Sequence, residues 1–534
     1  MLNKIKSKYI LNTIFENVKK KKKLDILKFN KKMQENLSIN KEDFLEFIYV
    51  KILKEEYKLN LNDDVDTKEL NLSGHPYIYI VLLFLKFIQF KKLKEINLSS
   101  NLISEPNVLE FLKTEKLEIL DLRNNRIKNI DIFEKLNFKE LKNLDLCTNY
   151  IDDINVFEKV NFPKLEILKL DYNPIYDLDV FKKVHFPELK VLSLFKCQIY
   201  NFSLLSLKSV NFKKLEILNL KSNFISNIII MKKYDFPDLK VLNLSNNEIH
   251  DINTLEKVNF PKLETLDLDQ NNISDINIFK NVNFKNLKKL NLNYNQISDI
   301  KVLEKVKFEK LEILNLSHNR KIDINILINA KFKMLKNLNL SYNNITDINI
   351  LEKYKFEKLE ILDLRENKIT GINILSNVNF KELKELNLSG NQISNIEVLE
   401  KVNFQKLEIL NLERNSISDI NALINANFKE LKELELSGNN ISNIDVLEKV
   451  KFDKLELLSL ISNKISDINI LEKVNFKNLT KIALSRNKIK DIRVFEKVKF
   501  EKLNVIYLEE NNISQECSDI INKLKSTIEY FFFW

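Results

Sequence analysis

The chain of 534 residues is poor in several residue types on which compact enzymes and secreted proteins depend. It has 4 glycines and 7 prolines, although glycine supplies the positive-φ turns and close backbone approaches that ligand sites need. Four glycines cannot serve the three or four globular domains that this length would otherwise indicate. Hydrophobic residues make up 44% and charged residues 30%, which suffices to bury a core and argues against a disordered chain. An ordinary α/β enzyme is therefore not expected.

Cysteine is also scarce, and the three that occur are scattered. Cys147, Cys197 and Cys517 form no CxxC pair and provide no disulfide framework, which suits a reducing compartment. The N-terminus has a short apolar stretch without a cleavage site of small residues, so we expect no signal peptide. These features predict a cytoplasmic protein.

Long apolar runs are missing as well. The most apolar window, Tyr77 to Phe90, contains Lys86 and is shorter than the roughly 20 residues that a membrane-spanning helix needs. We interpret it as buried core and expect no membrane contact, with a membrane anchor as the minor alternative. Basic charge is concentrated elsewhere, because residues 1–60 hold 15 lysines against 8 acidic residues and so account for most of the net charge of +10.

No catalytic or metal-binding arrangement can be recognised. The four histidines lie far apart, and no HExxH motif or metal-spaced cluster occurs. The dispersed glycines cannot form a phosphate loop. Neither Cys147 nor Cys197 is expected to act as a nucleophile. We therefore expect no enzyme, no cofactor and no metal.

What the sequence has instead is a 24-residue repeat. An asparagine follows each L-x-L pair and recurs at this spacing from Asn101 to Asn511, with Cys197 in one of its places and a single wider spacing from Cys197 to Asn223. There are 18 such units and a degenerate one at Glu69 to His75. Units reading EKLEIL alternate with units reading KELKEL or KMLKNL. This 48-residue super-period indicates that a block of two repeats was amplified.

Each position of the unit has a physical interpretation. The leucines of L-x-L face one side of a short strand, and strands of successive units pair in parallel about 4.8 Å apart. The asparagine carries donors and an acceptor that can satisfy loop backbone groups. A phenylalanine thirteen residues later, as in Phe138 and Phe162, is expected to stack into a buried spine. Ser-Asp pairs such as Ser274-Asp275 suit the N-cap of a short helix.

The unit that starts at Leu383, LKELNLSGNQISNIEVLEKVNFQK, opens with L-x-x-L-x-L-x-x-N. This pattern resembles the leucine-rich repeat family over about residues 68–534. The following N-x-I-S-x-I-x-x-L resembles the internalin and phosphatase-regulatory repeat classes, in a 24-residue variant that is two residues longer. The resemblance implies an α/β solenoid with a curved parallel sheet on the concave face and short helices on the convex face. It also implies scaffold or adaptor work, in which protein partners are bound without catalysis.

The chain is divided into three parts. Residues 1–67 are predicted to form a helical N-terminal cap, residues 68–513 a solenoid of about 18 to 19 repeats, and residues 514–534 a cap helix and a closing strand. Caps are expected because terminal repeats otherwise expose apolar faces. In the closing strand, Tyr530 and Phe532 are predicted at the inward leucine positions, with Phe531 and Phe533 on the other face.

Two alternative functions remain open. The apolar spacing between Tyr9 and Leu37 resembles the F-box, a small helical module that docks a linker subunit of ubiquitin ligases. That resemblance implies a substrate receptor of a ubiquitin ligase. The internalin-like repeats leave a surface adhesin as the other alternative, against which the missing signal peptide argues.

Binding is expected at the strand positions that flank the second leucine of each pair, on the concave face. Acidic residues outnumber basic ones nine to four there. A phosphate-binding track needs a Lys/Arg stripe, so nucleic acid is not expected and a protein partner with a mixed or basic surface fits better. We expect a monomer, and the best single patch combines Phe195 with the charges between Arg123 and Lys221. The predicted partner-binding residues are Asp121, Arg123, Asp145, Lys169, Asp171, Phe195, Lys221, Asp267, Asp269, Asp363, Arg365, Glu413, Glu435 and Tyr507.

Overall fold

The computed structural model describes residues 67–75, 78, 81, 90, 92–111, 115–201, 203–320, 322–354, 356–498 and 500–533. The chain forms two compact units, Met1–Leu215 and Glu216–Trp534. The predicted N-terminal cap and the F-box-like stretch lie outside the described residues, apart from Thr67. In the part of the chain that is described, no helix combines the length and apolar character needed to cross a membrane.

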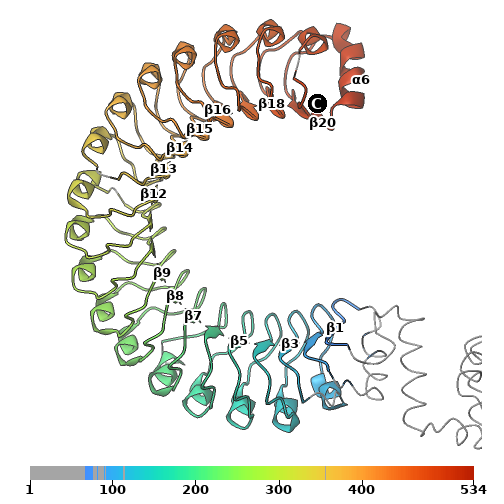
Figure 1. The fold of residues 1–534 in the computed structure, drawn as a ribbon, viewed down its shortest axis with the longest axis vertical. Helices are drawn as coiled ribbons and strands as arrows, with labels where there is room; N and C mark the ends of the chain where they lie inside the picture. Colours follow the sequence, from blue (N-terminus) through green and yellow to red (C-terminus); the bar gives the residue numbers. More distant parts are fainter. Residues whose placement is uncertain are drawn as a thin grey trace, which may run out of the picture. The chain divides into compact units, whose positions relative to one another are not determined.

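Each unit is a stack of repeats whose three-residue strands pair in parallel with the strand of the next repeat. The register places the central apolar residue of each strand opposite that of its neighbour, as Leu290 lies opposite Leu314. Within each unit the strands lie on the inner, concave side and the short helices on the outer, convex side (Figure 1). The predicted curved parallel sheet with short helices behind it is confirmed.

The elements of the first unit follow the repeat closely. Its described strands are β1 (Glu69–Asn71), β2 (Glu95–Asn97), β3 (Ile119–Asp121), β4 (Asn143–Asp145), β5 (Ile167–Lys169) and β6 (Val191–Ser193). Its 3-10 helices are η2 (Pro106–Phe111), η3 (Asp131–Lys135), η4 (Asn155–Glu158), η5 (Asp179–Lys182) and η6 (Ser203–Ser209).

The second unit continues the same alternation and ends in an α-helix and a last strand. Its described strands are β7 (Ile217–Asn219), β8 (Val241–Asn243), β9 (Thr265–Asp267), β10 (Lys289–Asn291), β11 (Ile313–Asn315), β12 (Asn337–Asn339), β13 (Ile361–Asp363), β14 (Glu385–Asn387), β15 (Ile409–Asn411), β16 (Glu433–Glu435), β17 (Leu457–Ser459), β18 (Lys481–Ala483), β19 (Val505–Tyr507) and β20 (Tyr530–Phe532). Its described helices are η7 (Ile229–Lys233), η8 (Asn253–Lys257), η9 (Asn277–Lys280), η10 (Lys301–Glu304), η11 (Ile324–Asn329), η12 (Asn349–Lys353), η13 (Asn373–Ser376), η14 (Glu397–Glu400), η15 (Asn421–Ile424), η16 (Asp445–Glu448), η17 (Asn469–Glu472), η18 (Arg493–Glu496), η19 (Gln515–Cys517) and α6 (Ser518–Thr527).

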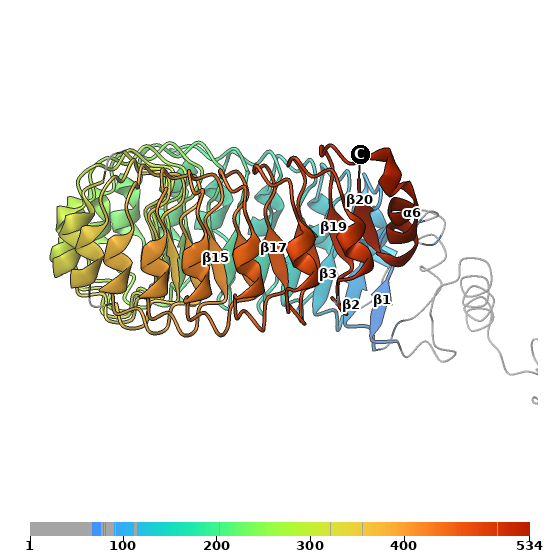
Figure 2. The same ribbon diagram turned by 90° about the horizontal axis from the view of Figure 1, so that it is seen from above.

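The convex segments are 3-10 helices because each repeat leaves room for little more than one turn, the length at which this tighter helix is common. Figure 2 shows them as a regular row on the convex side, in front of the strands for the repeats that contain β15 and β17. The aspartate of the predicted Ser-Asp pair is not the N-cap residue of η9, which is Ile276, but lies directly before it. Asp275 Oδ1 accepts a hydrogen bond from the backbone N–H of Asn277 at 2.8 Å, which satisfies one N–H at the start of η9.

The asparagine of each repeat ties that repeat to its neighbours. The fully buried Asn343 donates from Nδ2 to the carbonyl oxygens of Leu316, Leu340 and Ser341 at 2.9, 3.0 and 3.1 Å. Its Oδ1 accepts from the backbone N–H of Asn319 at 3.0 Å. One side chain therefore satisfies four backbone groups in two adjacent repeats, as the sequence predicted for this position.

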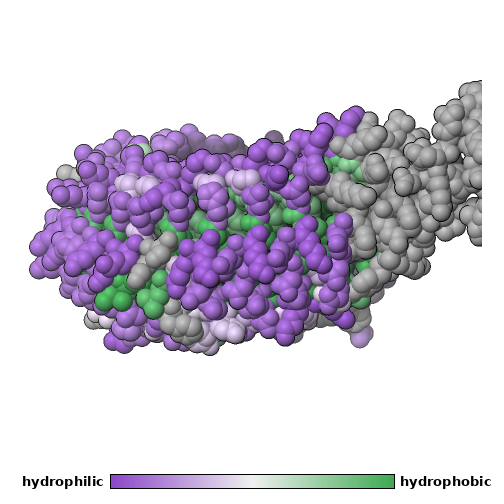
Figure 3. Space-filling model, turned by 90° about the horizontal axis from the view of Figure 1, so that it is seen from below, coloured by the Kyte–Doolittle hydropathy of each residue, from purple (hydrophilic) through white to green (hydrophobic). Residues whose placement is uncertain are grey.

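The phenylalanines thirteen residues after the asparagines form the predicted spine. In the first unit the rings of Phe138 and Phe162 lie nearly parallel with centroids 6.5 Å apart, and Phe162 and Phe186 repeat this spacing. In the second unit Phe236 and Phe260 stack at 6.4 Å. All of these rings are buried. Outside this core, hydrophilic residues cover most of the surface in Figure 3, and apolar residues gather in a narrow band between them.

Lysine and glutamate alternate just before the strands and form what we call the charged edge. In the second unit Lys384 Nζ lies 2.7 Å from Glu360 Oε2, and two residues earlier in the repeat Lys406 Nζ lies 2.5 Å from Glu382 Oε2. The 48-residue super-period therefore has a physical consequence, because it places opposite charges side by side in adjacent repeats. The same pattern in this unit includes Lys240–Glu216, Lys288–Glu264, Lys336–Glu312, Lys432–Glu408 and Lys454–Glu430.

The last strand differs from its prediction. β20 pairs in parallel with β19, and Phe531 lies opposite the buried Ile506, while Tyr530 and Phe532 lie opposite Val505 and Tyr507. The side chains of Tyr530 and Phe532 are exposed, so placing them at inward positions was wrong. The step from Ile506 to Phe531 is one residue longer than the repeat, and a shift of one residue moves every strand side chain to the opposite face.

Candidate functional site

The inner surface of the strands offers three positions per repeat, and we call it the sheet face. In β10 the central Leu290 is buried, whereas the flanking Lys289 and Asn291 are partly exposed. A third position follows the next leucine, as Asn293 does here. The predicted partner-binding residues are divided between the two units. The six from Asp121 to Phe195 lie on the sheet face of the first unit, and Lys221 and those from Asp267 onward lie on the sheet face of the second.

In the first unit the predicted charges are largely paired with one another. Arg123 Nε lies 3.2 Å from Asp121 Oδ2, and Lys169 Nζ lies 3.8 Å from Asp145 Oδ2. Burial raises the pKa of the Asp121 carboxyl despite its bond from the Arg123 backbone. The predicted patch around Phe195 is therefore a set of internal ion pairs, and its Lys221 belongs to the other unit.

An aromatic cluster accompanies Phe195. Its ring meets Tyr172 edge-on with centroids 4.6 Å apart, and Lys196 Nζ lies 5.3 Å from the centre of the Tyr172 ring. The backbone N–H of Phe195 donates to Asp171 Oδ1 at 2.8 Å. Tyr172 is 44% exposed, so an aromatic surface that the sequence argument passed over lies beside the predicted residue.

In the second unit two aspartates of one repeat lie side by side. Asp267 Oδ1 accepts from Asn291 Nδ2 at 3.0 Å, and Asp269 Oδ1 accepts from Asn293 Nδ2 at 2.8 Å. Neither carboxylate forms an ion pair within the described residues. Burial raises the pKa of Asp269, and the charge of Asp267 raises it further. This acidic pair is thus held in place by neutral amides without being neutralised.

Farther along the second unit, the predicted residues from Asp363 to Glu435 form a more acidic part of the sheet face. Asp363 Oδ2 pairs with Arg365 Nε at 3.3 Å, and Glu413 Oε1 pairs with the Nε of its neighbour Arg414 at 3.4 Å. Burial raises the pKa of Glu435, and the negative charge of Glu413 raises it further. This stretch keeps an excess of negative charge.

Near the C-terminal end of the sheet, the rings of Tyr507 and Phe532 stack with centroids 4.6 Å apart. Lys481 Nζ lies 5.0 Å from the centre of the Tyr507 ring. The predicted residue Tyr507 therefore lies in an aromatic pair that the register of β20 creates.

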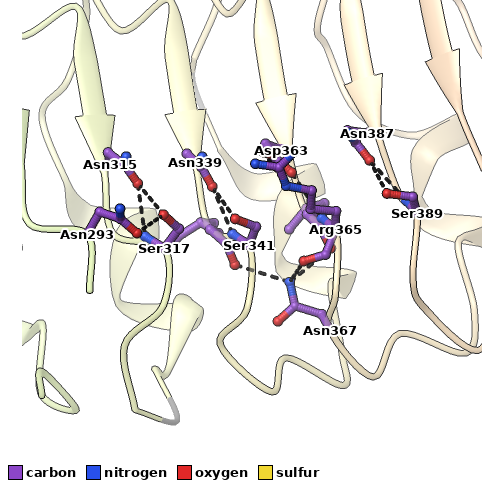
Figure 4. A network of polar contacts seen from close by, with 12 residues as sticks. Asn293, Asn315, Ser317, Asn339, Ser341, Asp363, Arg365, Asn367, Asn387 and Ser389 are labelled. Carbon is purple, nitrogen blue, oxygen red and sulfur yellow. Dashed lines mark hydrogen bonds and ion pairs between the residues drawn. The ribbon is translucent and has the colours of Figure 1, made fainter. Parts of the chain in front are cut away.

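The asparagines and serines of the sheet face hold the ends of the strands. Asn339 Oδ1 accepts from the backbone N–H of Ser341 at 3.0 Å and from its hydroxyl at 2.8 Å. Figure 4 shows the same bonds in the neighbouring repeats. These residues form turns in which the side chain bonds the backbone two positions on. They order the face, and they leave it without charge.

Sequence reasoning missed the position directly before the asparagine that ties each repeat to its neighbours, the ladder asparagine. We call this preceding position the rim position. Its backbone φ is positive in repeat after repeat, for example 47° at Tyr294, 50° at His318 and 57° at Tyr342. These three rings stack in series, with centroids 3.8 Å apart at each step. An aromatic residue before the asparagine at 24-residue intervals was the available signal.

The described residues offer little to nucleophilic or metal chemistry. No group of three or more His, Cys, Asp or Glu side chains that could hold a metal ion is found among them. Burial raises the pKa of Cys197 to about 12 and raises that of Cys147 strongly. Cys197 takes the place of a ladder asparagine, as predicted, and its Sγ donates to the carbonyl oxygen of Leu170 at 3.2 Å.

Comparison with known families agrees with the repeat. The family model described as Leucine Rich repeats (2 copies) matches residues 115–159, 237–281 and 381–425, and the model described as Leucine rich repeat matches residues 261–320 and 333–393. Together with the stacked strands and the asparagine ladder, these matches identify a leucine-rich-repeat protein. No curated protein matches the sequence.

Several solved structures are similar in fold. The Arabidopsis receptor kinase HAESA, solved in complex with the peptide hormone IDA and the co-receptor SERK1, is 21% identical with a TM-score of 0.51, over 85% of this chain and 80% of that one. A leucine-rich-repeat protein of Leptospira interrogans is 21% identical with a TM-score of 0.44, over 90% and 98%. The ectodomain of the Arabidopsis thaliana receptor kinase GASSHO1/SCHENGEN3 is 22% identical with a TM-score of 0.49, over 88% of this chain and 59% of that ectodomain.

Proposed function

We propose that this protein is a non-catalytic scaffold or adaptor that binds a protein partner on the sheet face. One observation carries the proposal. The positions that stack repeats hardly change along the chain, whereas the sheet face changes from repeat to repeat, from Asp267 and Asp269 to Asn315 and Ser317. Side chains that stacking leaves unconstrained are available for recognition.

The comparisons support the proposal at the level of fold. HAESA was solved with a peptide hormone and a co-receptor bound, so a protein of this fold binds peptide and protein partners. The excess of acidic over basic residues on the sheet face favours a partner with a mixed or basic surface. The adaptor role and the cytoplasmic location predicted from the sequence stay predictions.

A photo-crosslinking amino acid tests the proposal even while the partner is unidentified. We place it in the full chain at Asn291 on the sheet face, and at the exposed Asn277 of η9 on the convex side as the matched control. Irradiation in native extract should give a discrete adduct from position 291 and none from position 277. Adducts from position 277 alone would contradict a binding site on the sheet face.

The F-box alternative makes a different prediction. If the N-terminal stretch docks a ubiquitin-ligase linker subunit, that subunit should co-purify with the full chain and be lost on deletion of residues 1–60. Recovery of the same sheet-face adduct with and without residues 1–60, and of no linker subunit with either, would favour the scaffold.

A further inference from the structure

The stacked rings of Tyr294, His318 and Tyr342 form a continuous feature that we call the aromatic ladder. Backbone bonds between repeats hold it in place, because Tyr294 N–H donates to the carbonyl of Ser317 at 3.1 Å and His318 N–H donates to that of Ser341 at 3.0 Å. Tyr294 is 48% and Tyr342 38% exposed. Burial lowers the pKa of His318, as does the charge of Arg365, so the ladder is uncharged near neutral pH.

The ladder occupies the rim position, which has a positive φ in repeat after repeat. Elsewhere the rim position holds glycine or asparagine, as at Gly390, Gly438, Asn124 and Asn246, but also serine, threonine, lysine, glutamine, glutamate and arginine. What distinguishes Tyr294, His318 and Tyr342 is that their rings stack through three consecutive repeats.

The surface next to the ladder is unusually neutral. At the three sheet-face positions and the rim position of the repeats of β10, β11 and β12, Lys289 is the charged residue and the others are asparagine, serine, isoleucine and the ladder itself. Tyrosine with serine and asparagine is the composition of antibody binding loops, where rigid rings give contact area and small polar groups give hydrogen bonds. The combination suits a protein surface with an uncharged centre.

The acidic pair Asp267 and Asp269 lies at the β9 end of this neutral surface. Asn293 Nδ2, which donates to Asp269, belongs to the residue directly before Tyr294. Parallel strands are spaced about 4.8 Å apart, so β9 and β12 are separated by about 14 Å. An extended chain spans this distance in about four residues.

The ring geometry limits what can be bound. Both faces of His318 are covered by its neighbours, and each tyrosine has one face covered. The ladder therefore presents ring edges and hydroxyls. Aromatic edges carry partial positive charge and pack against the negative face of another ring. Along the length of the ladder a partner aromatic side chain fits these edges better than a sugar or a base, which would need the outer face of Tyr294 or Tyr342.

We propose, building on the scaffold function proposed above, that the aromatic ladder and the acidic pair together bind one extended segment of a protein partner. An aromatic side chain of that segment packs on the ladder edge over Tyr294, His318 and Tyr342. A lysine or arginine about four residues away pairs with Asp267 and Asp269. The two contacts define a short aromatic–basic motif in the partner.

A displayed library of random peptides about 12 residues long, more than enough to span the surface, is selected on the full chain. We expect enrichment of peptides in which an aromatic residue and a lysine or arginine are about four residues apart. An enriched synthetic peptide is then titrated against variants by fluorescence anisotropy. Enrichment without this pattern would overturn the proposal.

The variants separate the two contacts. Loss of a hot-spot aromatic of this kind weakens binding by about 30-fold or more, so the double variant Tyr294→Ala, Tyr342→Ala should show such a loss. Asp267→Asn with Asp269→Asn should weaken binding by about fivefold at low salt and less at high salt. Tyr150→Ala is the control, because Tyr150 is an exposed tyrosine of the first unit that lies outside both the sheet face and the rim position, and it should bind as the unchanged protein does.

A conservative variant guards against a folding defect. Tyr294→Phe with Tyr342→Phe keeps the stacked rings and should keep binding within about twofold, since the ring edges supply the contact. Unchanged peptide affinity in the alanine double variant would overturn the proposal that the aromatic ladder binds the partner. So would a glycan that binds the unchanged protein and is lost in that variant. Crosslinks from Asn291 together with any of these results would leave the scaffold function standing while the ladder proposal falls.

Discussion

The charged edge and the sheet face of the second unit are built from the same repeat, yet they use charge in opposite ways. On the edge, Lys384 meets Glu360 at 2.7 Å, and the alternation continues through the neighbouring repeats. On the sheet face, Asp267 and Asp269 lie together in one repeat and form no ion pair within the described residues. On the sheet face of the three repeats that follow, Lys289 is the single charged residue.

The difference shows where an array of this kind can bind. Side chains on the edge complement the next copy of the repeat, so their charge is compensated inside the array. Side chains on the sheet face need not complement the next repeat, and where they do not, they keep unbalanced charge or exposed rings for a partner. Binding should depend on the sheet face, and stacking on the edge and the asparagine ladder.

The largest effect is expected from the asparagine that ties neighbouring repeats together. Asn343→Ala leaves the part-buried backbone N–H of Asn319 without its acceptor and removes one of the two amide donors to the carbonyls of Leu316 and Leu340. An unsatisfied buried group costs about 1–3 kcal/mol. The urea midpoint should fall accordingly. Asn421→Ala, at an exposed position of η15, is the control and should change little. Equal urea midpoints for both variants would contradict the role of the ladder asparagines in stacking the repeats.

A smaller effect, sensitive to salt, is expected on the charged edge. Lys384→Glu places three glutamates in consecutive repeats, since Glu360 and Glu408 flank it on the edge. The midpoint should fall at low ionic strength and recover most of the difference at about 1 M salt, where the screening length is about 3 Å. Lys381→Glu makes the same charge change at an exposed position nearby. A loss of equal size in that control would show that net charge, and not pairing, is responsible.

The smallest effect concerns stability and has the opposite sign. The pKa of Asp269 is raised in the folded protein, chiefly by burial. The folded state thus binds the proton more tightly than the unfolded chain, and stability falls as pH rises through that pKa. Asp269→Asn removes this loss, so the variant should be the more stable protein at pH 7. The difference should vanish near pH 3, below the ordinary aspartate pKa of about 3.9. If Asp269→Asn were less stable than the unchanged protein at pH 7, the claim that the charge of Asp269 is unbalanced would be contradicted.

The constant period of the repeat was enough to predict the solenoid, because every stacking position recurs with it. The buried contacts of Asn343 and the parallel rings of Phe138 and Phe162 follow from that period and from elementary chemistry. Where the period fails, so does the prediction. The longer step into β20 reversed the faces of Tyr530 and Phe532, and no repeat remained to reveal it.

The candidate site was predictable only in part. The sequence located the sheet face and its charges, but it could not tell that Asp121 and Arg123 pair with each other. Nor could it tell that the residue before the asparagine has a positive φ, which brings Tyr294 and Tyr342 into a stack with His318. Pairing and ring stacking depend on side-chain geometry that spacing alone does not contain.

The central claim is that the sheet face binds while the charged edge stacks, and one titration tests it directly. The selected peptide is measured against the unchanged protein, the Tyr294→Ala, Tyr342→Ala variant and the Lys384→Glu variant, at equal ionic strength and below the unfolding range of all three. The account predicts loss of binding in the tyrosine variant and unchanged affinity in the edge variant. Loss of affinity in the edge variant with full binding by the tyrosine variant would contradict it.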